Sequence, residues 1–178
     1  MAANTQFSAE RSLELRDAAK NGTLTKSSLK ALVSAGADID WKGNGGWTAL
    51  HWAVDYRRME AVTALLEAGA NTELTTNDGG WTPLHGAAYL GHSDAVTALL
   101  AANTDMTPVE IYGKTALQIA TSRNHQECIA ALEATRVFRE TALPFVTPLL
   151  RDVFCSDVAK PIFDYAFWPV KRLTAWET

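Results

Sequence analysis

The sequence predicts an all-α fold in which short helical units repeat along the chain and stack into a solenoid. A Thr-Ala-Leu or Thr-Pro-Leu motif begins at Thr48, Thr82 and Thr115, at successive spacings of 34 and 33 residues. The apolar segment Ala-Val-Thr-Ala-Leu-Leu follows in the same register at residues 61–66 and again at 95–100. A unit of this length cannot bury its own apolar face, so neighbouring units must cover one another.

Composition and charge narrow the class of protein further. The 178 residues are 47% hydrophobic and 20% charged, which is ordinary for one domain with a short appendage. The net charge of −4 disfavours a nucleic-acid-binding protein, which usually presents a basic patch to phosphate. The start of the chain lacks the pattern of a signal peptide, and no segment reaches about eighteen uninterrupted apolar residues. We therefore expect a monomeric, soluble protein of the cytoplasm or nucleus that binds neither nucleic acid nor membrane.

The first unit is expected to be atypical. Residues 1–12 are predicted to form an N-terminal arm and residues 13–42 the first repeat, which lacks the Thr-x-Leu start but keeps later positions such as Leu15 and Gly22. Gly22 and Gly36 are 14 residues apart where the next two units have 12, so this unit contains two extra residues. Terminal repeats often diverge because they expose one face to water.

Residues 43–76 and 77–109 are predicted to form the second and third repeats. Thr48 and Thr82 stand where the first helix of each should begin, and a threonine oxygen accepts hydrogen bonds from the free N–H groups there. Pro83 suits the first helical turn, where no backbone N–H bond is lost. Leucine pairs at helical spacing are expected to fill the space between helices.

The second helices of the first two repeats should end at Gly36 and Gly69, because glycine tolerates the left-handed conformation that terminates a helix. Residues 110–142 form the fourth and last predicted repeat. It carries Gln118 where the two preceding repeats have histidine, and Cys128 falls on the apolar face of its second helix. We expect this cysteine to be a core residue, because buried thiols are inert.

Residues 81–92, Trp-Thr-Pro-Leu-His-Gly-Ala-Ala-Tyr-Leu-Gly-His, closely resemble the signature of the ankyrin repeat family. The resemblance extends over residues 13–137. It implies an all-α ankyrin-repeat solenoid of about four helix–turn–helix units with β-hairpin or loop fingers. It also implies a non-catalytic module for protein–protein interaction rather than an enzyme.

No constellation of residues indicates catalysis, a cofactor or a metal. All four histidines occupy repeat positions, where in this family they usually bond to neighbouring loops and helices: His51, His85, His92 and His125. Paired His or Cys ligands at zinc spacing are absent from the sequence, and so is a Gly-rich phosphate loop. We therefore expect no cofactor, and another protein as the partner.

In ankyrin repeat proteins the partner usually binds the concave side, which consists of the fingers and the inner helices. The resemblance places there the residue before each capping threonine, the pair before each inter-helix turn, and the finger positions. Aromatic residues and arginine, which often dominate binding energy, are frequent among them. The candidate partner-binding residues are Trp41, Lys42, Asn44, Trp47, Asp55, Tyr56, Asp78, Trp81, Tyr89, Leu90, Tyr112, Lys114 and Arg123.

Two of the candidate tryptophans also have a structural interpretation. Trp47 and Trp81 have an alternative role, which is to pack on adjacent fingers as purely structural residues. Trp52 is expected to point into the helix pair, so it is not a candidate.

Residues 143–178 contain four of the six prolines and are predicted to form a Pro-rich helical extension. One interpretation is a cap that covers the open end of the solenoid. The other is a docking box, loosely similar at Leu143, Leu149 and Leu150 to the suppressor-of-cytokine-signalling and F-box types. A docking box would make the protein a substrate adaptor of a ubiquitin ligase.

Overall fold

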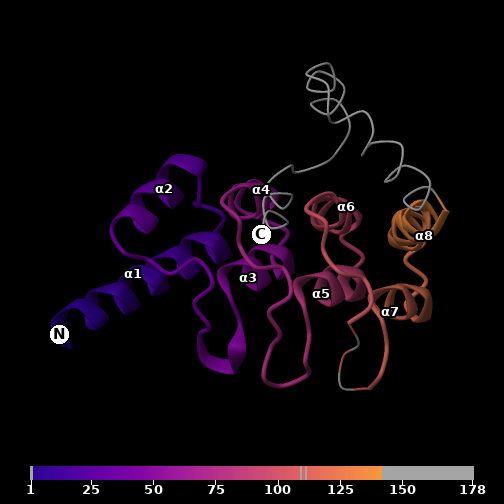
Figure 1. Ribbon diagram of the computed structural model, residues 1–178, viewed down its shortest axis with the longest axis horizontal. Coiled ribbons are helices and arrows are strands. Elements are labelled where there is room, and N and C mark those ends of the chain that lie inside the picture. Colours follow the sequence, from indigo (N-terminus) through magenta and orange to yellow (C-terminus); the bar gives the residue numbers. More distant parts are fainter. Residues whose placement is uncertain (1, 109, 111, 142–178) are drawn as a thin grey trace, which may run out of the picture.

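The computed structural model describes residues 2–108, 110 and 112–141, and its helices form two stacked layers (Figure 1). The inner layer consists of α1 (Ala2–Asn21), α3 (Ala49–Asp55), α5 (Pro83–Leu90) and α7 (Ala116–Ser122). The outer layer consists of α2 (Lys26–Ser34), α4 (Met59–Glu67), α6 (Ser93–Ala101) and α8 (Gln126–Thr141). Each inner helix packs against the outer helix that follows it and against the next inner helix. The predicted all-α solenoid is confirmed.

Three fingers connect each outer helix to the next inner helix and extend to one side of the solenoid (Figure 1). One backbone hydrogen bond closes each finger: Gly43 N–H donates to Trp47 O, Thr76 N–H to Trp81 O, and Glu110 N–H to Lys114 O. The first finger also contains the short 3-10 turn η1 (Asn44–Gly46). No strand occurs in the described parts of the fingers, so they are loops rather than β-hairpins there.

Threonines begin three of the inner helices, as predicted. The side chain of Thr48 accepts a hydrogen bond from the N–H of His51, and the His51 side chain accepts one from the Thr48 N–H. Thr82 makes the same reciprocal cap with His85. In α7 the partner of the capping threonine is Gln118 instead. These reciprocal bonds satisfy backbone N–H groups that have no partner within the helix.

The predicted helix ends are also present. Gly36 and Gly69 adopt left-handed conformations, with φ angles of 95° and 84°. Asn103 takes this position after α6 with φ of 61°, which asparagine tolerates better than most residues. Arg57 occupies the turn between α3 and α4 with φ of 52°, a conformation that is uncommon for a long side chain.

Leucines from both layers form the core. Leu50 and Leu84 of the inner helices and Leu65 and Leu99 of the outer helices are at most 1% exposed. The inner helices carry small residues between these leucines, such as the fully buried Ala87. Small side chains allow the paired helices to approach closely, and the leucines then fill the space between layers.

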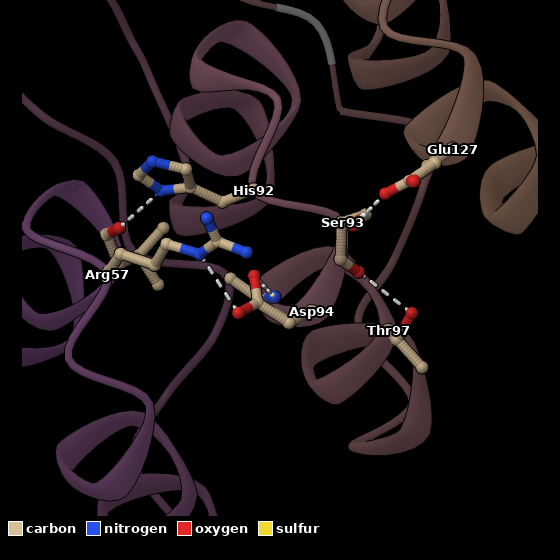
Figure 2. A network of polar contacts seen from close by, with 8 residues as sticks. Arg57, His92, Ser93, Asp94, Thr97 and Glu127 are labelled. Atoms are coloured by element: carbon tan, nitrogen blue, oxygen red, sulfur yellow. Dashed lines mark hydrogen bonds and ion pairs between the residues drawn. The ribbon is translucent and has the colours of Figure 1, made fainter.

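Polar contacts join successive repeats where inner helices turn into outer ones (Figure 2). Nδ1 of His92 lies 3.0 Å from the main-chain oxygen of Val54, and Nε of Arg57 lies 3.0 Å from Oδ2 of Asp94. One repeat further on, the Ser93 hydroxyl donates to Glu127 at 2.7 Å. These bonds fix the register between neighbouring repeats at the solenoid surface.

Residues 2–12, within the predicted N-terminal arm, are helical. Helix α1 begins at Ala2, so residues 2–12 are continuous with the first helix of the first repeat. No glycine or proline interrupts this segment, and it also contacts the first finger. The Ser8 hydroxyl donates to Gly36 O at 2.8 Å, and Ser12 Oγ accepts from Asp38 N–H at 2.9 Å. The cap or docking box predicted for residues 143–178 lies outside the described residues.

Candidate functional site

A groove of about 480 Å³ lies between helices α3 and α5 and the second and third fingers, and Trp47 at the end of the first finger also lines it. Residues from these segments come together there although they are up to 65 positions apart, from Trp47 to Tyr112. Seven of the candidate residues line it: Trp47, Asp55, Asp78, Trp81, Tyr89, Leu90 and Tyr112. We call this feature the aromatic groove. Its walls are mainly ring faces and aliphatic groups, with a few polar side chains between them.

Trp47, in one wall of the groove, belongs to an aromatic cluster at α3 whose other members, Trp52 and Tyr56, do not line the groove. The ring centroids of Trp47 and Trp52 are 4.6 Å apart, and those of Trp52 and Tyr56 are 6.0 Å apart. Nζ of Lys20, from α1, lies 4.7 Å from the centroid of the Trp52 ring and 5.4 Å from that of Tyr56. The expectation that Trp52 points into the helix pair is therefore wrong. Its ring is half-buried because it stacks on Trp47 under the Lys20 ammonium.

The opposite wall has a second cluster of the same kind. The rings of Trp81 and Tyr89 meet edge to face, with centroids 5.1 Å apart. The guanidinium carbon of Arg123, from the fourth repeat, lies 3.5 Å from the Tyr89 centroid. Tyr112, on the third finger, is 76% exposed at the rim. Such pairs of rings and cations contribute about 0.5–1.5 kcal/mol each.

The other candidates lie outside the groove. Trp41 is half-buried in the first finger beneath Arg16, whose guanidinium carbon is 5.9 Å from its ring centroid. Nζ of Lys42 donates to Thr75 O at 3.0 Å and so joins the first two fingers. Asn44 begins η1, and Lys114 is exposed at the base of the third finger. Trp52, which was not among the sequence-based candidates, also belongs to the surface, and the i,i+4 spacing of Trp52 and Tyr56 could have indicated this.

Two carboxylates line the groove, and no lysine or arginine does. Burial raises the pKa of Asp55, against the opposing effects of His92 and Lys20. Asp78 is exposed on the second finger. Neither carboxylate forms a hydrogen bond or ion pair within the described part of the chain. The electrostatic character of the groove is therefore acidic.

The buried histidines of the inner helices have a structural role, because each ring bonds to a main-chain oxygen of the finger that follows. Nε2 of His51 lies 3.0 Å from Trp81 O, and Nε2 of His85 lies 3.0 Å from Pro108 O. Burial lowers the pKa of His51 from 6.5 to about 4 and also lowers that of His85, so both rings are neutral at pH 7. Within residues 2–108, 110 and 112–141, no group of three or more His, Cys, Asp or Glu is placed to hold a metal ion.

Paired helices joined by loop fingers, with a groove between the fingers and the inner helices, define a helical repeat protein. The chain belongs to the ankyrin repeat family, because the family model "Ankyrin repeats (3 copies)" matches residues 15–109 and 74–140. Ankyrin repeats generally mediate protein–protein interaction, and the family is typically non-catalytic. No described helix is long and apolar enough to cross a membrane.

Relatives match the chain over single stretches. Calmodulin-binding transcription activator CBT of Oryza sativa subsp. japonica is 41% identical over 49 residues, 28% of this chain and 5% of that protein. Calmodulin-binding transcription activator 5 of Arabidopsis thaliana is 49% identical over 43 residues, 24% and 5% of the two chains. Ankyrin repeat domain-containing protein 40 of Mus musculus is 35% identical over 68 residues, 38% and 18%. The match thus spans less than one fifth of each of these relatives.

Proposed function

We propose that the protein is a non-catalytic interaction module that binds a partner protein on the face that carries the aromatic groove. The observation that supports this is the concentration of exposed rings and apolar side chains there. Among the described residues, seven large hydrophobic side chains are exposed, and Tyr56, Tyr89, Leu90 and Tyr112 lie on this face. Exposed apolar clusters on a folded protein commonly mark interaction sites.

The groove supplies the features that an interface centre needs. Trp81 is half-buried and so is already partly ordered, which lowers the entropic cost of binding. Tryptophan and tyrosine contribute disproportionately to binding energy when a partner covers them. The partner would cover Trp47, Trp81 and Tyr89, while the finger residues Lys42 and Lys114 would contact its periphery. Net charge of −4 favours a protein over a nucleic acid as partner.

Affinity capture with matched baits tests this proposal. One bait is the intact chain, and a second carries Leu90→Ser and Tyr112→Ser, which change exposed groove residues with little effect on the core. A control bait carries Val33→Ser and Phe138→Ser, which are also exposed but lie on outer helices. A further bait carries Trp47→Ala and Trp81→Ala. All are first compared by circular dichroism to establish equal helicity.

A partner that binds the intact and control baits but not the groove variants supports the assignment. A partner that binds all baits equally would move the interaction surface elsewhere on the chain. The alternative function, a ubiquitin-ligase adaptor, depends on residues 143–178, which the structure does not describe. It predicts that a peptide of residues 143–178 captures ligase components while the repeats do not.

A further inference from the structure

Two aromatic clusters flank the groove, and a cation from a neighbouring repeat covers each one at its outer end. Lys20 from the first repeat lies over Trp52, and Arg123 from the fourth repeat lies over Tyr89. The negative face of an aromatic ring attracts a cation, and the attraction is stronger where water is partly excluded. The protein therefore uses the same pairing twice on this face.

The groove side of the two clusters lacks the corresponding cation. Trp47 and Trp81 line the groove, and within the described residues no lysine or arginine lies over either ring. Asp55 and Asp78 line the same groove without a hydrogen bond or ion pair of their own in that part of the chain. Electron-rich rings together with carboxylates that have no bonded cation create a site with negative potential.

Resting on the proposed function, we infer that the groove receives an arginine or lysine side chain of the partner protein. The cationic group lies against the Trp47 or Trp81 ring and is attracted by the carboxylates of Asp55 and Asp78. Arginine fits better than lysine, because its planar guanidinium can stack on a ring while its N–H groups bond a carboxylate.

No lysine or arginine of the described repeats lines the groove. Lys20 and Arg123 lie over the outer rings, and the Lys42 ammonium is bonded to Thr75 O. The same chain contains two further cationic residues near its C-terminus, Lys171 and Arg172, which are a second candidate occupant of the groove. The experiment is designed to separate that occupant from a partner protein.

The test measures the indole N–H signals of the full-length chain by NMR, assigned with Trp→Phe variants. The probes are N-acetyl-arginine amide, N-acetyl-lysine amide and, as an uncharged control, N-acetyl-norleucine amide. One variant carries Asp55→Asn and Asp78→Asn. Its matched control carries Glu60→Gln and Glu133→Gln, which remove the same charge from exposed positions on outer helices. A third variant carries Lys171→Ala and Arg172→Ala.

We expect the arginine probe to shift the Trp47 and Trp81 signals saturably and the norleucine probe to leave them unchanged. The Asp55 and Asp78 variant should bind the arginine probe about tenfold more weakly, while the Glu60 and Glu133 variant binds normally. Equal shifts with norleucine, or no shift with either cation, would refute a cation site. The proposed protein-binding function would stand if the capture experiment still localised a partner to this face.

Two further outcomes would overturn the partner as occupant. Roughly tenfold tighter probe binding by the Lys171 and Arg172 variant would show that the chain's own C-terminal segment fills the groove. Trp47 or Trp81 signals that change on dilution without probe would point to a second copy of the chain. Unchanged probe affinity and concentration-independent signals support a separate partner protein.

Discussion

Nε2 of His51 lies 3.0 Å from the main-chain oxygen of Trp81, so the histidine that caps α3 also holds the second finger. Its Nδ1 atom accepts the Thr48 N–H at 3.3 Å, which leaves Nε2–H as the donor to Trp81. His85 repeats the arrangement with Pro108 of the third finger. Each ring thus couples a helix start to the finger that follows, and His51 also lines the groove.

The first prediction concerns the pH dependence of stability. Burial lowers the pKa of His51 from 6.5 to about 4, so between these pH values the unfolded chain binds a proton that the folded chain does not. Stability should therefore fall as the pH drops from 6.5 to 4, by about 3 kcal/mol from this residue. Urea unfolding followed by circular dichroism across this range measures the effect.

His51→Gln is the appropriate variant, because Gln118 already performs the same capping role in α7. It should lose about 1 kcal/mol at neutral pH through the bond to Trp81, and its stability should depend less on pH by about 3 kcal/mol. His85 continues to titrate in the variant, so a smaller decline should persist. An equally steep decline in both proteins would contradict the assignment.

The second prediction compares two glycines near the groove. Gly91 has φ of 74°, and an added Cβ would lie 2.7 Å from Nδ1 of His125, so Gly91→Ala should lower the free energy of unfolding by about 2 kcal/mol. Gly86 lies inside α5 with no atom within 4 Å of an added Cβ. Gly86→Ala should stabilise the protein by about 0.5–1 kcal/mol. Thermal unfolding of the two variants should give opposite shifts in Tm, and shifts of the same sign would contradict this account.

The third prediction separates packing from surface charge between neighbouring repeats. Leu99 is completely buried, so Leu99→Ala should cost about 3 kcal/mol. The Arg57–Asp94 ion pair is 3.0 Å long, but both side chains are more than one third exposed. Asp94→Asn should therefore cost less than about 1 kcal/mol. Urea unfolding at low and high salt provides the comparison, and a large salt-independent loss in Asp94→Asn would contradict it.

The fourth prediction concerns the reactivity of Cys128. Its side chain is fully buried in α8, and burial raises the pKa of the thiol, with Glu127 and Asp94 acting in the same direction. In a Cys155→Ser background, a thiol reagent should modify Cys128 only as fast as the repeats open. The same thiol should react rapidly in urea. Rapid modification of the native protein would contradict this prediction, because it would indicate an accessible and activated cysteine.

The sequence by itself determined where α3 and α5 begin and where α2 and α4 end. The caps at Thr48 and Thr82 and the left-handed turns at Gly36 and Gly69 depend on bonds within a few residues, so local patterns reveal them. The repeat period then determined the solenoid architecture, since each unit needs a neighbour of the same kind to bury its apolar face, and the motif at residues 81–92 indicated the family.

The tertiary structure alone decided how the surface residues meet. Seven candidates share one groove, whereas Trp41, Lys42 and Asn44 lie on the first finger outside it. Trp52 belongs to the surface because Trp47 stacks on it and Lys20 covers it from another repeat. The contacts between repeats depend on how successive repeats are rotated against one another, and that rotation results from packing among residues 30 or more positions apart.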